Sequence, residues 1–156
     1  MQPKVEKVLF VCTGNTCRSP MAATLFRQMA HQAGLVVEAA SAGVGAFAGA
    51  PASLGAIAAM RYYDIDLGSH AAAGLEQVAS FDLILTMTRR HRDLVVQNSP
   101  EIAGKVHVLR EYVAARGAAD VADPFGGSNK VYESCARELA DLMKLLVEKL
   151  KSEQSR

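Results

Sequence analysis

The sequence lacks the features that mark secreted, fibrous or nucleic-acid-binding chains. Its 156 residues include three cysteines, no tryptophan and 6% aromatic residues. Three cysteines are too few for a disulfide scaffold. The formal net charge is only +1, so nothing points to nucleic acid as the main partner. With 50% hydrophobic and 21% charged residues, the composition excludes a disordered chain and predicts one globular domain.

Long apolar segments are scarce too. The N-terminal region offers only the apolar run 8–12, which is shorter than the apolar core of a secretory signal. Residues 39–60 carry no charge and could span a bilayer by length, but glycines and a proline interrupt them and most of the rest is alanine. We therefore expect no membrane association. We expect a cytoplasmic protein, because thiols are normally reduced in that compartment.

Apolar segments alternate with amphipathic ones along the chain. Strands are predicted at residues 8–12, 36–41, 82–87 and 105–110, and helices at about 20–33, 52–63, around 89–92 and from 131 onward. This alternation predicts an α/β fold, a single three-layer domain in which a four-stranded parallel sheet is flanked by helices. The domain should occupy residues 1–156, with an ordered core of about 5–151.

The ends of the predicted helices follow known signals. Ser19 stands where an N-cap is expected, with Pro20 at the first helical position, and Gly34 can end that helix. Cys135 lies on the apolar stripe of the last helix, which predicts a core position. The segment 89–92 (RRHR) is interpreted as a solvated helix face.

A short motif, CTGNTCRSP at residues 12–20, follows the first predicted strand. Gly14 and Asn15 tolerate unusual backbone angles, so successive N–H groups could point inward and bind an anion. The next helix adds its positive end, and Arg18 offers a planar set of donors to phosphate. A buried cysteine beside a surface arginine is the plainer reading, but the strand-loop-helix setting favours a phosphate loop after the first strand. Cys12 would then be a nucleophile aimed at phosphorus.

Displacement at phosphorus also needs a proton donor for the leaving group. Asp123 lies in the polar segment ADPFGGSN before the last helix, where a carboxyl group could act first as general acid and then as base for water. A simple turn aspartate is the other interpretation, since Asp-Pro is common in turns. The sequence pattern alone leaves both open.

Together, VLFVCTGNTCRSPMA near the N-terminus and DPF near the C-terminus resemble the low-molecular-weight protein-tyrosine-phosphatase family over nearly the whole chain. The resemblance implies a four-stranded parallel sheet and a cofactor-free reaction through phosphocysteine. It implies that Cys12 is the nucleophile, Arg18 the phosphate clamp and Asp123 the general acid. Phosphorylated proteins are the implied partners, and we expect a monomer.

Further roles follow from the same resemblance. Asn15 would shape the loop, Ser19 would donate a hydrogen bond to the thiolate, and Ser41 and His70 would brace the loop. The implied substrate-binding residues are Thr13, Gly14, Asn15, Thr16, Cys17, Ser19 and Phe125. No metal is expected, because the four histidines show no ligand spacing with the cysteines.

Two departures from the tyrosine-specific pattern indicate the substrate. Threonines at 13 and 16 stand where bulky aliphatic residues are usual, and Phe125 is followed by two glycines instead of a second aromatic residue. Both features resemble the bacterial protein-arginine phosphatase branch. Thr16 could orient water and substrate, Asp123 could pair with guanidinium nitrogens, and Phe125 could face the substrate stem or cation. We therefore predict a protein-arginine phosphatase.

Cys17 lies in the same tight loop as Cys12. We expect a reversible disulfide between them, which would switch the enzyme off and protect Cys12 from over-oxidation. It requires the two Cβ atoms to approach within about 4.5 Å. The alternative is that Cys17 is a buried structural thiol.

Other functions remain as alternatives. A low-molecular-weight protein-tyrosine phosphatase would use the same catalytic residues. A thiol-coupled arsenate reductase would need further redox cysteines after the third strand, and residues 82–134 contain none. A phosphoprotein-binding module without activity is disfavoured by the intact Cys12, Arg18 and Asp123.

Overall fold

One parallel sheet organises the computed structural model, which describes residues 4–155. Its strands are β1 (Lys7–Cys12), β2 (Glu38–Gly43), β3 (Leu83–Thr86) and β4 (Val106–Val108), in the spatial order β2-β1-β3-β4. The helices are α1 (Arg18–Gln32), α2 (Leu54–Arg61), α3 (Arg89–Asn98), α4 (Leu109–Tyr112) and α5 (Asn129–Gln154), with 3-10 turns η1 (Val78–Ser80) and η2 (Pro100–Lys105). This arrangement confirms the predicted α/β fold.

The two faces of the sheet carry separate apolar layers, because successive side chains of a strand point to opposite faces. Val8, Phe10 and Cys12 of β1 pack in one cluster with residues of α1, α2 and α5. Leu9 and Val11 pack in the other cluster with α3, η1 and η2. A strand buried on both faces is continuously apolar, which is why the first strand is so plain in the sequence.

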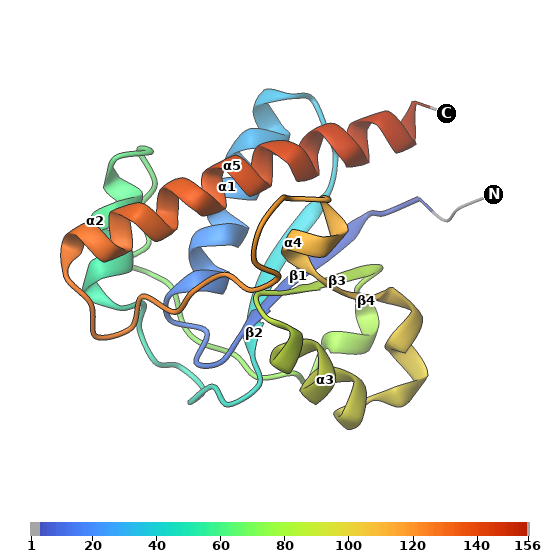
Figure 1. Cartoon of the computed structure of the whole chain (residues 1–156), viewed down its shortest axis with the longest axis horizontal. Coiled ribbons are helices and arrows are strands. Elements are labelled where there is room, and N and C mark those ends of the chain that lie inside the picture. The colour runs from blue at the N-terminus through green and yellow to red at the C-terminus, as the bar shows by residue number, and fades with distance from the viewer. Residues whose placement is uncertain (1–3, 156) are drawn as a thin grey trace.

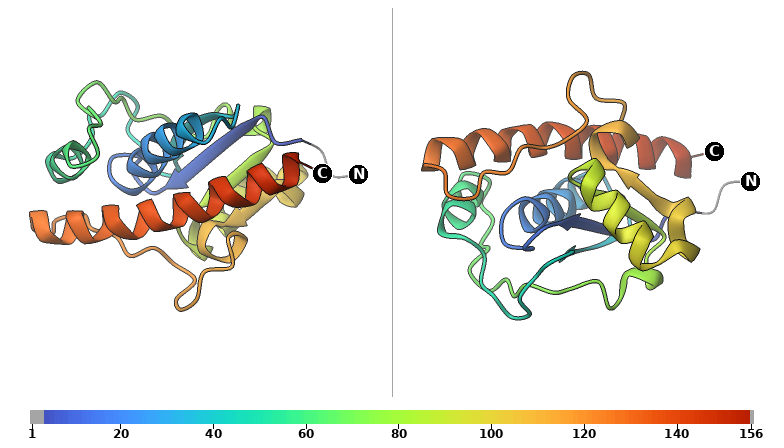
Figure 2. Two further views of the ribbon diagram at one scale, coloured as in Figure 1. Left: turned by 90° about the horizontal axis from the view of Figure 1, so that it is seen from above. Right: turned by 60° about the horizontal axis from the view of Figure 1, so that its bottom comes forward.

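The helices form the outer two layers. Figure 1 shows the long α5 crossing the molecule with α1 behind it and α2 beside its N-terminal end. The right-hand view of Figure 2 shows α3 and α5 on opposite sides of the strands. The predicted three layers are therefore present.

The carboxyl end of β1 lies where the strand order reverses. The chain moves outward from β1 to β2 and then crosses back to β3, on the other side of β1. In open α/β sheets such a switch point opens a crevice at the carboxyl ends of the strands. The loop that joins β1 to α1 lies at this crevice, so the topology presents residues 13–17 there.

The helix signals are partly confirmed. Gly34 ends α1 in the left-handed region (φ 71°), and the Leu35 N–H donates to the Ala30 carbonyl at 2.9 Å, as in a Schellman motif. Ser19 as N-cap is wrong, since α1 begins at Arg18 with Cys17 in the cap position. The Ser19 hydroxyl instead accepts a hydrogen bond from the Asn15 side chain and donates one to the Ala42 carbonyl. Cys135 is in the core, as predicted.

Two strand predictions are displaced. The second strand begins at Glu38 and not at residue 36, and its last residue is Gly43. The fourth strand is only three residues long, because Leu109 and Arg110 begin α4. Val36 and Val37 are β-branched like strand residues, and Leu109 is apolar like the residues of the strand before it, so composition could not separate strand from adjoining loop or helix.

The uncharged segment 39–60 is divided between β2, a loop and part of α2. Among residues 4–155, no helix combines the length and the apolar character needed to cross a bilayer.

Candidate active site

The loop between β1 and α1 keeps its backbone donors free. Within the described residues 4–155, no protein group accepts a hydrogen bond from the backbone N–H of residues 14–17. Asn15 has a φ of 57°, and alternating left-handed and right-handed residues turn consecutive N–H groups to one side. The start of α1 adds the positive end of a helix dipole. The loop can therefore bind an anion with several oxygens.

Asn15 holds this shape from a fully buried position. Its Oδ1 accepts from the Ala73 N–H at 2.9 Å, and its Nδ2 donates to Ser19 Oγ at 2.8 Å. The Asn15 carbonyl accepts from His70 Nε2 at 2.6 Å. Three partners thus stabilise a backbone angle that costs most residues free energy.

Cys12 ends β1 beneath the loop and is 3% exposed. Its Sγ lies 2.9 Å from Ser19 Oγ, which also lies 3.3 Å from the Ala42 carbonyl. When Cys12 is a thiol, it can donate to Ser19 while Ser19 donates to Ala42. When Cys12 is a thiolate, the Ser19 proton can turn to the sulfur, because the short distance suits a charge-assisted bond. The arrangement accommodates both protonation states.

Arg18 is buried behind the loop, at 5% exposure. Its Nη1 donates to the Val121 carbonyl at 2.8 Å, and the Val121 N–H donates to the Met87 carbonyl at 2.9 Å. These two hydrogen bonds connect the guanidinium to the residue after β3 and to the segment that carries Asp123. One nitrogen is thereby fixed, while other N–H donors of the fork stay available.

Asp123 lies opposite the loop, with its side chain half exposed. Its Oδ2 is 3.6 Å from Arg18 Nη2, which is an ion pair beyond hydrogen-bond length. Its Oδ1 accepts from the Phe125 N–H at 3.0 Å. Gly126 follows with φ 78°, and the Gly127 N–H donates to the Pro124 carbonyl at 2.8 Å, as in a type II turn. The two glycines thus present Phe125 at the mouth of the site.

A cavity of about 400 Å³ lies over Cys12. The loop between β2 and α2 supplies another wall, on which Phe47 is 84% exposed. Sequence reasoning missed Phe47, because an aromatic residue in a stretch of glycine and alanine carries no positional signal. The lining residues are Cys12, Thr13, Gly14, Thr16, Cys17, Arg18, Gly45, Phe47, Ala50, Asp123 and Phe125.

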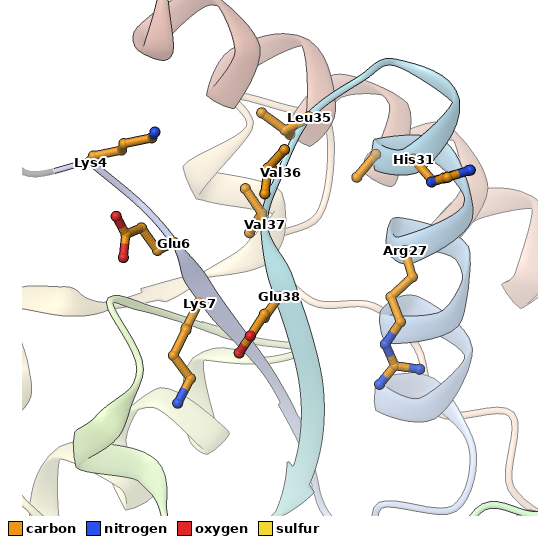
Figure 3. A pocket seen from close by; sticks show the side chains of 10 residues that line it. Lys4, Glu6, Lys7, Arg27, His31, Leu35, Val36, Val37 and Glu38 are labelled. Atoms are coloured by element: carbon orange, nitrogen blue, oxygen red, sulfur yellow. The ribbon is translucent and has the colours of Figure 1, made fainter.

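A larger cavity of about 540 Å³ lies at the other end of the sheet, near the amino ends of β1 and β2 (Figure 3). Its lining mixes cations and carboxylates, and Arg27 there donates from Nε and Nη2 to the Ala39 carbonyl. It has no cysteine or other buried nucleophile among its lining residues. Its size does not make it the candidate active site.

The supporting positions predicted from the resemblance have different outcomes. His70 contacts the loop through Asn15, as described above. Ser41 lies on β2 opposite Phe10, and within residues 4–155 its hydroxyl makes no hydrogen bond to the loop. The neighbouring Ala42 carbonyl makes the contact from β2 instead. Backbone acceptors of this kind leave no trace in a sequence.

The Cys17 side chain contacts the N-cap residue of α2 and one residue of α5. Its Sγ lies 3.2 Å from Ser53 Oγ and 3.4 Å from the Tyr132 hydroxyl. Burial, followed by the hydrogen bond to Cys17, raises the pKa of Tyr132. All three cysteines of the chain are free in this structure, and burial raises the pKa of Cys135 to about 12.

The solvated helix face predicted at residues 89–92 is wrong at His91. This side chain is 3% exposed, and its Nε2 lies 2.8 Å from Thr13 Oγ1. Burial, with Arg18 as the second cause, lowers the pKa of His91 to about 4. The imidazole is therefore neutral at neutral pH. The three flanking arginines made the burial of His91 hard to predict, because a run of charged residues in a helix is usually exposed to solvent.

The chain matches a known family over nearly its whole length. The sequence model of the family described as "Low molecular weight phosphotyrosine protein phosphatase" matches residues 7–156. A protein-arginine-phosphatase of Bacillus subtilis (strain 168) is 40% identical over 149 residues, which cover 94% of this chain and 98% of that one. The low molecular weight protein-tyrosine-phosphatase PtpB of Staphylococcus epidermidis is 35% identical, over 88% and 94% of the two chains.

Solved structures agree with the sequence matches. The crystal structure of a YwlE mutant from Bacillus subtilis superimposes with a TM-score of 0.89 at 40% identity, covering 94% of this chain and 99% of that one. At this identity and coverage, the shared fold extends over nearly the whole chain.

A methyl group at Gly43 should deform the loop. An added Cβ would overlap the Thr13 carbonyl and lie 2.9 Å from the Asn15 nitrogen. We expect Gly43→Ala to lower kcat/KM at least tenfold, since small displacements of catalytic groups are costly, and to lower the free energy of unfolding by about 1–3 kcal/mol. Hydrolysis of p-nitrophenyl phosphate and urea unfolding measure the two effects.

Gly45 provides the matched control for unfolding. An added Cβ there meets the Thr13 carbonyl at 3.9 Å, an ordinary contact, so Gly45→Ala should unfold within about 0.5 kcal/mol of wild type. Equal stability of the Gly43 and Gly45 variants would contradict the close approach.

Neutral His91 should make stability depend on pH. Its pKa falls from 6.5 to about 4 on folding, so its stabilising contribution is complete above pH 6.5 and is lost as the pH falls toward 4. Between pH 7 and 4.5 the wild type should lose roughly 2 kcal/mol more than His91→Gln, as measured by urea unfolding at both pH values. The exposed His31→Gln should follow wild type, and identical losses in all three proteins would refute the burial argument.

Proposed function

This chain belongs to the low molecular weight phosphotyrosine protein phosphatase family, and on that premise we propose that it is a protein-arginine phosphatase. It would hydrolyse the P–N bond of phosphoarginine in proteins through a phosphocysteine intermediate. The proposal is supported by the curated relative that is itself named for this activity. It is supported independently by the hydroxyl groups of Thr13 and Thr16 and the carboxylate of Asp123, which are among the groups that line the cavity over Cys12.

In the first step the Cys12 thiolate attacks phosphorus. An S–P bond forms, the P–N bond breaks, and the departing guanidino nitrogen takes the proton of the Asp123 carboxyl group. The free N–H groups of residues 14–17 and the remaining donors of Arg18 stabilise the charge that develops on the phosphoryl oxygens. The 2.8 Å bond from Arg18 to Val121 keeps the guanidinium in place during this change.

In the second step the Asp123 carboxylate takes a proton from water. The resulting hydroxide attacks phosphorus, the S–P bond breaks, and inorganic phosphate leaves while Cys12 returns to the thiolate. Ser19 Oγ, 2.9 Å from the sulfur, donates to the thiolate that is released. The 3.0 Å bond from the Phe125 N–H to Asp123 Oδ1 limits the rotation of the carboxylate, so that one group serves both steps.

One observation favours phosphoarginine over phosphotyrosine: the loop side of the cavity carries two hydroxyl-bearing residues, Thr13 and Thr16. A guanidino group is planar, polar and rich in hydrogen-bond donors, so hydroxyl oxygens and the Asp123 carboxylate suit it. The exposed rings of Phe47 and Phe125 can cover the flat faces of that group and its aliphatic stem. A wall of aliphatic side chains would suit a phenol ring better.

A protein-tyrosine phosphatase is the second candidate, and the relative from Staphylococcus epidermidis carries that name. Both activities would use the same nucleophile, clamp and acid. They differ only in the leaving group, so a comparison of substrates separates them.

The proposed setting of the reaction is simple. We propose a monomer that acts in the cytoplasm on phosphorylated proteins as a single domain, without membrane or nucleic-acid partners. The net charge of +1 supports the absence of a nucleic-acid partner. Free thiols at all three cysteines suit a reducing compartment.

The first experiment compares matched phosphoarginine and phosphotyrosine peptides, with Cys12→Ser as the blank. We expect a strong preference for phosphoarginine in kcat/KM. A preference for phosphotyrosine would retain the mechanism and reject the proposed substrate. No turnover of either peptide would favour a binding module.

Thr13 and Thr16 together form what we call the polar wall of the cavity. Variants of Thr16 test, in the same assay, whether this wall determines the selectivity. Thr16→Val keeps the shape and removes the hydroxyl, and Thr16→Ile also adds a methylene. We expect both to lower the ratio of phosphoarginine to phosphotyrosine hydrolysis, Thr16→Ile by about tenfold or more, since discrimination by one polar contact and one methylene is of that size. Thr24→Val, whose hydroxyl bonds only within α1 and to Met60, should leave the ratio unchanged. An unchanged ratio in both Thr16 variants would reject this wall as the selectivity element.

We also propose that Cys12 and Cys17 form a reversible disulfide. Peroxide would oxidise the two thiols with loss of two protons and two electrons, and itself become two waters. The bond requires Cys17 Sγ to leave Ser53 and Tyr132, which hold it through weak sulfur contacts at 3.2 and 3.4 Å. Because thiols form only weak hydrogen bonds, these contacts oppose a rotation of the Cys17 side chain only slightly.

Peroxide inactivation of the wild type should therefore be reversed by dithiothreitol. Cys17→Ala should lose activity irreversibly, because Cys12 would proceed to sulfinic acid. Cys135→Ala, a matched change of a buried thiol outside the loop, should recover like wild type. Irreversible loss in wild type at the rate of Cys17→Ala would reject the switch.

A further inference from the structure

His91 joins α3 to the phosphate loop through one hydrogen bond. It lies in the first turn of α3, where its own N–H donates to the Thr88 hydroxyl at 3.1 Å. Its Nε2 lies 2.8 Å from Thr13 Oγ1. Thr13 directly follows Cys12 and lines the cavity over it. A buried ring on one element therefore contacts a side chain that faces the substrate.

The two ring nitrogens have different surroundings. Among the described residues, Nδ1 of His91 is a buried polar atom without a hydrogen-bond partner. A proton on Nδ1 would therefore be buried without an acceptor, which is costly. The favoured neutral form carries its proton on Nε2 and donates it to Thr13 Oγ1. The Thr13 hydroxyl then accepts from His91 and keeps its own proton free on the cavity side.

Charges of both signs surround this ring. Arg18 of α1 and Arg90 of α3 disfavour the protonated form, whereas Asp120 and Asp123 favour it. Burial and Arg18 dominate and keep the ring neutral. A donor that is neutral at neutral pH fits a role in fixing the direction of a hydroxyl group and does not fit a role as general acid there.

We propose that His91 is a positioning residue for substrate selectivity: its Nε2–H fixes the Thr13 hydroxyl as part of the polar wall that favours the guanidino leaving group over an aromatic ring. This inference rests on the proposed phosphoarginine activity. Without the hydrogen bond, the side chain of Thr13 can rotate and present its methyl group to the cavity. The loss would reduce discrimination between leaving groups more than it reduces the attack by Cys12.

The test compares His91→Phe, His91→Gln, Thr13→Val and the double variant His91→Phe/Thr13→Val. The Phe variant keeps a planar ring, the Gln variant keeps an N–H donor, and the Val variant keeps the shape of threonine. For each protein, kcat/KM is measured with a phosphoarginine peptide and with p-nitrophenyl phosphate. His31→Gln, a histidine at the opposite end of the sheet, is the control, and thermal unfolding confirms that each variant folds.

We expect His91→Phe and Thr13→Val each to lower the ratio of the two kcat/KM values about tenfold, as suits one oriented polar contact. The double variant should be no worse than either single variant, because both remove the same interaction. His91→Gln should restore most of the ratio. If His91→Phe does not fold, Thr13→Val still tests the inference, because Thr13 lies on the surface of the cavity and an unchanged ratio in that variant rejects the role of the hydrogen bond.

Three results would overturn the inference. One is an unchanged ratio in Thr13→Val or His91→Phe while wild type still prefers phosphoarginine, which rejects His91 and retains the proposed function. Another is independent, multiplying losses in the double variant. The third is a wild-type preference for phosphotyrosine peptides, which rejects the proposed function and this inference with it.

Discussion

The site depends on a loop whose backbone donors must remain free of protein partners. Unpaired N–H groups are costly in a folded protein, so residues 14–17 need support from outside their own backbone. Asn15 supplies it by occupying the left-handed region while its side chain and carbonyl bond to Ser19, His70 and the Ala73 backbone. The free energy gained in those bonds keeps the loop open for an anion.

Each remaining part of the site is anchored to the same few strand ends. Arg18 donates a hydrogen bond to the Val121 carbonyl, and the Val121 N–H donates to the carbonyl of the residue after β3. The Arg18 side chain and the segment that carries Asp123 are therefore held at the same point of the sheet. His91 reaches Thr13 from α3 on the other face of the sheet. Elements from both outer layers therefore meet at the carboxyl end of β1. Rigid support from several directions is what a loop needs if its groups are to stay oriented toward a reacting phosphorus.

The chemistry divides between a shared and a variable part. Cys12, Arg18 and Asp123 suit attack at phosphorus whatever the leaving group is. Thr13 and Thr16 line the cavity over Cys12, where we propose that the leaving group binds and that small changes of polarity alter discrimination. A family with one mechanism can thus contain relatives named for phosphoarginine and for phosphotyrosine. In this chain we propose that Thr13, Thr16 and the turn at Phe125 favour phosphoarginine.

The sequence by itself determined the α/β class and the loop after the first strand, and it proposed Cys12 as the nucleophile, because alternating segments and a compact motif express local physics. It also marked Asp123, although as one of two interpretations. Only the tertiary structure decided which distant groups meet. It places the Val121 carbonyl within hydrogen-bond distance of Arg18, the Ala42 carbonyl near Ser19 and the His91 ring near Thr13. It also places Phe47 in the wall of the cavity. A backbone carbonyl has no sequence signature, and the burial of one histidine among arginines depends on how α3 packs against β3 and β4. Contacts between residues far apart in the chain are set by packing, and no local pattern encodes them.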